Sequence, residues 1–178
     1  MTTKQLVTGA LLSAFTLVIL YLTFLIPTNT LTLLTLASVM VPIALIRCNL
    51  KTCWLVYITS GVLSLIFLPI NISMLYILFF GVYGIIKYFI EKLNQLPLEW
   101  ILKYLFFNII FFIGFKFTTT LINPNAFNGL MNLAKQFLPN IPYNAFLILI
   151  IIGQVAFAVY DYALTLLIDT YYTYVSKY

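Results

Sequence analysis

The residues from Leu6 to Ile26 read LVTGALLSAFTLVILYLTFLI and contain no charged side chain. Crossing the hydrocarbon core of a bilayer takes about 20 apolar residues in a helix, and this stretch is long enough. Pro27 ends it, because proline breaks the interior of a helix. The stretch is too long for a secretory signal and no small-x-small cleavage site precedes a soluble domain. We therefore expect a retained transmembrane helix.

The composition of the whole chain is that of a membrane protein. Its 178 residues are 63% hydrophobic and 7% charged, with nine basic and four acidic side chains and no histidine. A soluble domain carries about 25% charged residues, so these charges are too few to solvate a globule of this size. The formal charge of +5 is small and the basic residues are scattered, so we expect no nucleic-acid partner.

Five further apolar stretches follow the first one. We predict an all-α membrane protein, a bundle of six transmembrane helices that forms a single domain over residues 1–178. The second and third stretches are short, so we expect any irregular helical backbone to lie in one of these two. The expected spans are residues 6–26, 31–46, 52–68, 73–90, 100–120 and 144–168.

The basic residues predict the orientation of the bundle, because lysine and arginine concentrate in cytoplasmic loops. With both termini cytoplasmic, seven of the nine fall on or near the inner side, namely Lys4, Arg47, Lys51, Lys87, Lys92, Lys103 and Lys177. Lys116 and Lys135 fall on the outer side, and all four acids lie in the inner half. The abundance of Ile, Asn, Tyr and Phe suggests the cell membrane of an AT-rich Gram-positive bacterium.

The last outer connection, residues 121–143, is long and carries apolar residues at helical spacing between two proline-containing turns. It predicts a short amphipathic helix in the outer interface. Two interpretations remain open, a lid over a binding site and a plain interfacial anchor.

The sequence contains no pattern for catalysis. Without histidine there is no Ser–His pair, and four acids leave no paired carboxylates. Cys48 and Cys53 lie in a cytoplasmic connection with no other ligand nearby, whereas zinc needs four ligands. We predict that the protein is not an enzyme and has no metal site and no cofactor.

Small residues gather in the inner part of the first span, where Gly9, Ala10, Ser13 and Ala14 form two pairs spaced four apart. Small side chains let helices approach closely where lipid supplies no hydrophobic drive. The approaching helix either belongs to this bundle or comes from a partner subunit.

With its size, six spans, inner termini, Ala10-x-x-x-Ala14 pair and structured last outer loop, the chain resembles the substrate-binding S components of energy-coupling-factor (ECF) vitamin transporters. The stretch Phe80–Lys87 followed by Glu91 resembles members of that group with unassigned substrates. The resemblance implies that Ala10 and Ala14 dock on a membrane scaffold subunit driven by two ATPases. It also implies a vitamin or related micronutrient as the cargo.

A small set of polar and aromatic residues within the spans forms the candidate substrate site. Lys116 either snorkels to the outer interface or faces a cavity. Because the outer half contains no acid, we expect a neutral or anionic ligand. Mid-membrane amides must form hydrogen bonds, with another helix or with a ligand. The candidate substrate-binding residues are Lys116, Asn108, Gln154, Tyr76, Phe79, Tyr83 and Asn144.

Asp161 and Lys87 lie at similar depth in the inner halves of the sixth and fourth spans, so we predict a buried ion pair with a structural or docking role. Glu99 and Lys103 are four residues apart at the start of the fifth span. That spacing predicts a local helical pair that anchors this span at the inner interface.

A second class of function also fits the composition. A structural membrane subunit of the cell-shape machinery has the same size and helix number and needs no pocket for a small molecule. Its partners would be cytoskeletal or peptidoglycan-synthesis proteins instead of ATPases.

Overall fold

The computed structural model describes residues 1–117, 120 and 145–176. Over these residues the chain is helical without strands, and six helical segments are long and apolar enough to cross a membrane. The predicted class, an all-α bundle with six transmembrane helices, is confirmed. The protein is therefore a multi-pass membrane protein. The expected outer helix at 121–143 and the candidate Asn144 lie outside the described residues.

The first three spans form an antiparallel group. They are α1 (Thr3–Leu25), α2 (Thr30–Arg47), which a short 3₁₀ turn η1 (Pro27–Asn29) joins to α1, and α3 (Leu50–Phe67). Side chains cap the N-terminal ends of α1 and α3. Thr2 and Gln5 form a capping box at the start of α1, and Asn49 Oδ1 accepts from the Thr52 N–H at 2.9 Å at the start of α3.

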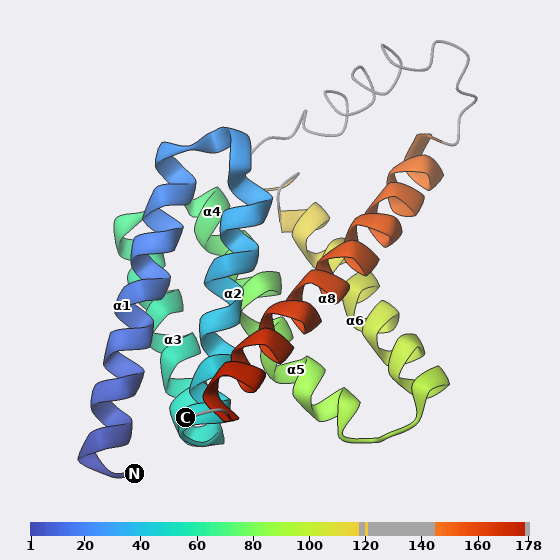
Figure 1. Cartoon of the computed structure of the whole chain (residues 1–178). Coiled ribbons are helices and arrows are strands. Elements are labelled where there is room, and N and C mark those ends of the chain that lie inside the picture. The colour runs from blue at the N-terminus through green and yellow to red at the C-terminus, as the bar shows by residue number, and fades with distance from the viewer. Residues whose placement is uncertain (118–119, 121–144, 177–178) are drawn as a thin grey trace.

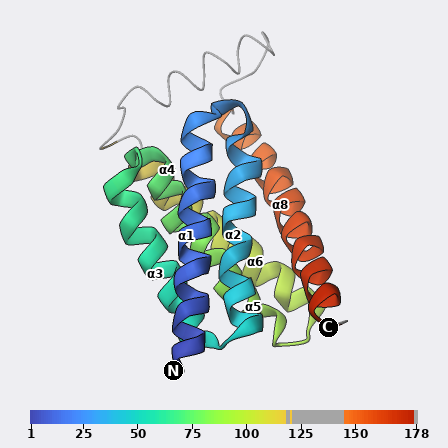
Figure 2. The same ribbon diagram turned by 60° about the vertical axis from the view of Figure 1, so that its left-hand side comes forward.

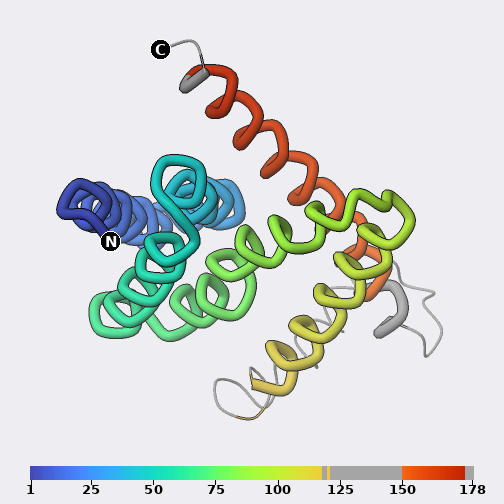
Figure 3. The backbone as a smooth tube through the Cα atoms, turned by 90° about the horizontal axis from the view of Figure 1, so that it is seen from below, coloured from blue at the N-terminus to red at the C-terminus, as the bar shows by residue number. Residues whose placement is uncertain are grey.

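The remaining spans complete the bundle on one side of this group. The fourth span consists of α4 (Ile70–Leu75), a π-helical turn η2 (Tyr76–Phe80) and α5 (Gly81–Glu91). The fifth is α6 (Leu96–Phe117) and the sixth is α8 (Ala145–Ser176). Both termini lie at the same end of the bundle, which we call the termini end (Figures 1 and 2). Seen from that end, α1 and α6 lie on opposite sides of the bundle (Figure 3).

The irregular backbone lies in the fourth span, and α2 and α3 are continuous helices. In η2 the Gly81 N–H donates to the carbonyl of Tyr76, five residues back. The hydroxyl of Tyr57 on α3 donates to the Ile77 carbonyl at 2.9 Å. We expected any irregular backbone in the short second and third spans, whereas the structure has a π turn in the fourth span. A tyrosine from α3 supports this turn.

Helices α2 and α5 meet at a point where only glycine fits. A Cβ added to Gly84 would lie 2.7 Å from Cγ of Pro42, inside van der Waals contact. Pro42 is part of α2, so its ring cannot retreat without moving the helix. This contact sets the closest approach of α2 and α5.

Helix α6 buries fewer of its side chains than the other spans do. Within Leu96–Phe117, which the structure describes in full, Lys103 is the one buried residue. The helix begins one turn before the predicted start at Trp100, with Pro97 in its first turn, where proline is tolerated. Lys103 consequently lies one turn deeper in the span than the sequence indicated.

We predict that Gly84→Ala destabilises the bundle by about 1–3 kcal/mol, the usual cost of overpacking. Gly114→Ala on α6 is the matched control, because within the described part of the chain no atom outside its own stretch of helix lies within 4 Å of the added Cβ. Thermal unfolding in detergent compares the two variants. Equal midpoints for them would contradict the close α2–α5 packing.

Candidate functional site

The most distinctive site is a ring of four charged side chains, which we call the ionic quartet: Lys87, Glu91, Lys103 and Asp161. Lys87 Nζ lies 2.5 Å from Asp161 Oδ1 and 2.7 Å from Glu91 Oε1. Lys103 Nζ lies 2.8 Å from Glu91 Oε1 and 3.2 Å from Asp161 Oδ2. Each lysine therefore contacts both carboxylates, and the four formal charges cancel.

The quartet joins three helices. Lys87 and Glu91 face it from the last turns of α5, Lys103 from α6 and Asp161 from the middle of α8. Asp161 has a further donor, because the Tyr83 hydroxyl lies 2.6 Å from Oδ1. Three of the charged side chains are 3–7% exposed, whereas that of Glu91 is 40% exposed. Glu91 is thus the one member at the edge of the bundle.

The structure forms the expected Lys87–Asp161 pair and extends it. Lys103 does not form the local pair with Glu99 that the sequence suggested; it is buried and contacts Glu91 and Asp161. The additional turn at the start of α6 explains the difference, because it moves Lys103 away from the membrane interface and into the bundle. Exchanging the charges of Lys87 and Asp161 would therefore not test their pair alone, because a carboxylate at position 87 would also face Glu91.

We predict that Lys103→Met destabilises the protein by about 3–5 kcal/mol, because it leaves an uncompensated buried charge. Adding Glu91→Gln restores a neutral set around the Lys87–Asp161 pair, so the double variant should recover most of the loss. The exposed Lys92→Met is the control. Strictly additive effects in thermal unfolding would show that Glu91 and Lys103 do not interact.

Aromatic rings fill the region next to the quartet. Phe79 of η2 stacks on Tyr83 with ring centroids 5.8 Å apart, and it meets Phe157 of α8 at 6.1 Å. Phe107 of α6 stacks on Phe157 at 4.8 Å. The sequence had named Phe79 and Tyr83 for this region. The rings that it missed are Tyr104, Phe106, Phe107, Phe157 and Tyr160; with 29 Phe and Tyr residues in the chain, no local signal singled them out.

The two mid-membrane amides contact each other. Gln154 Nε2 on α8 donates to Asn108 Oδ1 on α6 at 2.9 Å, and Asn108 Nδ2 donates to the Tyr104 carbonyl at 2.7 Å. Gln154 Oε1 is buried, and the described residues offer it no hydrogen bond. The amide pair bridges two helices and leaves one carbonyl acceptor available.

Tyr76 and Lys116, the other predicted substrate residues that the structure describes, have different surroundings. Tyr76 is fully buried against α3, where its hydroxyl lies 2.7 Å from Ser60 Oγ. Lys116 is exposed in the last turn of α6. At 1.5 Å per residue it lies about 12 Å along the helix from Asn108. The structure thus brings Phe79, Tyr83, Asn108 and Gln154 into one region. Tyr76 packs in the same core with its hydroxyl bound to α3, and Lys116 lies outside the region.

The π turn places Phe79 and Phe80, so we predict that Tyr57→Phe shifts these rings. Removing the hydroxyl deletes its hydrogen bond to the Ile77 carbonyl and should cost about 0.5–1.5 kcal/mol. Tyr21→Phe, exposed on α1, is the control for the loss of a hydroxyl. Thermal unfolding and near-ultraviolet circular dichroism measure both effects, and unchanged values for both would contradict the role of Tyr57.

The four small residues of α1 divide between two faces. Gly9 and Ser13 are buried against α3: a Cβ on Gly9 would lie 3.0 Å from Thr52 Cγ2, and Ser13 Oγ lies 2.8 Å from Thr59 Oγ1. Ala10 and Ala14 are exposed on the surface of the bundle. The first pair therefore packs within the bundle, and the second pair is available to another helix.

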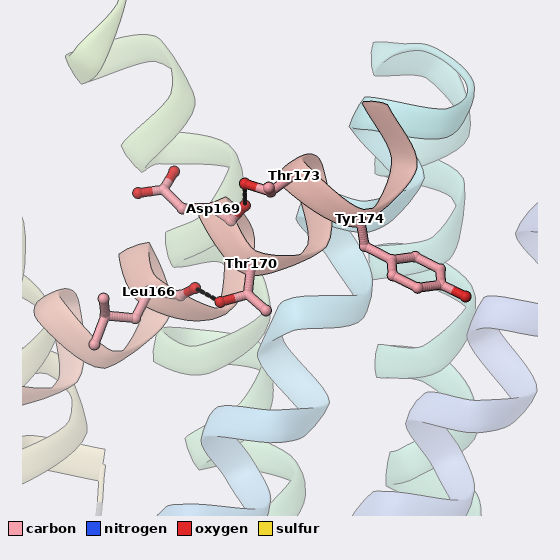
Figure 4. Close-up of a pocket in the computed structure, with 5 residues that line it drawn as sticks. All are labelled: Leu166, Asp169, Thr170, Thr173 and Tyr174. Carbon is pink, nitrogen blue, oxygen red and sulfur yellow. Dashed lines mark hydrogen bonds between the residues drawn. The ribbon is translucent and has the colours of Figure 1, made fainter. Parts of the chain in front are cut away.

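A shallow open depression lies along α8 near the termini end. It is lined by Leu166, Asp169, Thr170, Thr173 and Tyr174. The hydroxyls of Thr170 and Thr173 donate to carbonyls of their own helix, and Asp169 and Tyr174 point apart (Figure 4). With a lining from one helix, it does not enclose a ligand.

Groups that would hold a metal ion, with three or more Cys, Asp or Glu side chains together, are not found among the described residues. No protein-family model, curated protein or solved structure matches the sequence. We therefore infer the function from the composition, the resemblance and the contacts described above.

Proposed function

We propose that this protein is the membrane-embedded substrate-binding subunit of an ECF-type uptake transporter. It would bind a neutral or anionic small molecule, a vitamin or related micronutrient, from the side opposite the termini end. Both termini would face the cytoplasm. The observation that supports this most directly is the division of α1, with Gly9 and Ser13 packed inward and Ala10 and Ala14 exposed.

The exposed alanines Ala10 and Ala14 are suited to contact with a partner helix, and contact with lipid alone does not require such small side chains. Small side chains allow a close helix–helix approach and lose little side-chain entropy on contact. They belong to α1, and α1 and α6 lie on opposite sides of the bundle (Figure 3). A scaffold subunit docked there would leave the region between α6 and α8 free for a ligand.

That region supplies the substrate contacts in our proposal. Phe79, Tyr83 and the Asn108–Gln154 pair combine apolar rings with a few polar atoms, which is the usual composition of a ligand site. The Gln154 Oε1 acceptor would receive a hydrogen bond from the ligand. The quartet is net neutral, so a subunit that reorients in the membrane carries little uncompensated charge with it.

The structural membrane subunit remains the second candidate. The dense aromatic packing around Phe79 favours it, because a scaffold needs no ligand site. Native mass spectrometry of the purified protein separates the two functions. A retained small molecule supports transport, and its absence together with cytoskeletal partners supports the alternative.

We predict that the protein co-purifies with a membrane scaffold and two ATPases, and that Ala10→Trp abolishes this association. The large ring would prevent close approach at an exposed position, so folding and ligand retention should persist. Phe15→Trp is the control. It places the same side chain at an exposed site about 140° around α1, at 3.6 residues per turn.

Pull-down from membranes measures the association of each variant. Loss of the ATPases from Ala10→Trp, with retention in Phe15→Trp, is the expected result. If the partners of the unaltered protein are peptidoglycan-synthesis proteins, the transport proposal is wrong.

A further inference from the structure

The corner of the quartet at Glu91 differs from the corner at Asp161. Both oxygens of Asp161 are bound, by two lysines and by Tyr83, in a side chain that is 6% exposed. At Glu91 both lysine ammonium groups meet the same oxygen, Oε1, at 2.7 and 2.8 Å. This oxygen occupies a position that two positive charges from two helices define.

Glu91 can leave this position more easily than Asp161. It is the last residue of α5, and the exposed residues Lys92–Gln95 follow it before α6. Asn94 in this connection adopts the left-handed conformation, with φ 53°, and its N–H donates to the Glu91 carbonyl at 3.2 Å. The Glu91 carbonyl is thus held by a hydrogen bond, while its side chain is 40% exposed and has room to turn outward.

When the Glu91 carboxylate turns outward, two ammonium groups remain beside the single charge of Asp161. The excess of one positive charge in a largely buried place strongly favours another anion there. Two ammonium groups that converge on one oxygen form charge-assisted hydrogen bonds, which are suited to a carboxylate. Glu91 then acts as a tethered competitor for the position.

We propose that the ammonium groups of Lys87 and Lys103 form a binding site for a small soluble carboxylate, which Glu91 occupies when no ligand is present. The proposal concerns the quartet alone and is independent of the transport function. The site lies toward the start of α6, about 7.5 Å along that helix from Asn108. It adjoins the substrate region proposed above, because Tyr83 of that region donates a hydrogen bond to Asp161, but its ligand would occupy the position of the Glu91 carboxylate.

Chemical rescue tests the proposal. We expect Glu91→Ala, in phosphatidylcholine nanodiscs and chloride buffer, to unfold at a lower temperature than the unaltered protein. Sodium acetate or formate should raise its midpoint progressively with concentration, because a ligand that binds only the folded state stabilises it. Sodium chloride at equal ionic strength and neutral acetamide should not. The unaltered protein should respond only at higher acetate concentration, because tethered Glu91 competes.

Three controls make the result specific. Glu99→Ala removes an acid outside the quartet and should not respond to acetate. Lys103→Met combined with Glu91→Ala removes one ammonium group and should lose the response. Glu91→Gln keeps the side-chain size without the charge, so its amide is a weaker competitor and acetate should raise its midpoint less than that of Glu91→Ala but more than chloride does, which covers the case in which the alanine variant fails to fold.

The proposal is wrong if neither Glu91 variant gains more from acetate than from chloride, or if Glu99→Ala gains equally. Nanodiscs that contain phosphatidylserine distinguish the source of the carboxylate. If these lipids alone restore the midpoint and acetate does not, the site takes a lipid headgroup and the soluble ligand is excluded. Both outcomes are independent of ATPase association, so they do not decide the transport function.

Discussion

Four charges that must stay together decide where α5, α6 and α8 lie. A lone lysine or aspartate at the middle of a membrane span costs about 2.5–3.5 kcal/mol on insertion scales, so each one needs an opposite charge on a neighbouring helix. For α6 this requirement is the main restraint, because Lys103 is its one buried residue. Once Lys103 meets Asp161, Phe107 of α6 lies against Phe157 of α8. The aromatic region thus depends on the ionic quartet for its alignment.

The first three helices associate by different chemistry. Hydroxyl pairs such as Ser13–Thr59 and close approaches at glycine hold α1 against α3. These contacts are short and neutral, as expected where lipid removes the hydrophobic drive between helices. One side of the bundle is therefore packed through small residues, and the other side is held through charges.

The sequence predicted the all-α class and six membrane-spanning helices correctly, because apolar length alone reveals a membrane helix. It also paired Lys87 with Asp161, because depth along a span can be counted from its ends. It missed Lys103 because that count began at Trp100, and the helix in fact begins at Leu96. Glu99 offered a local partner at the favoured spacing, which concealed the long-range contact. The π turn had no local signal either, since its supporting hydroxyl comes from Tyr57 on another helix.

Helix α2 contacts both sides of the bundle and offers a direct path between α1 and α8. It packs on α1, α3, α5 and α8. At mid-span, Ser38 Oγ accepts from the Tyr160 hydroxyl at 3.2 Å, one residue before Asp161. Pro42 lacks an N–H, so it cannot donate to the carbonyl four residues back, which belongs to Ser38. Gly84 lies against the Pro42 ring. A shift of α2 would therefore reach α5 through Gly84 and α8 through Tyr160.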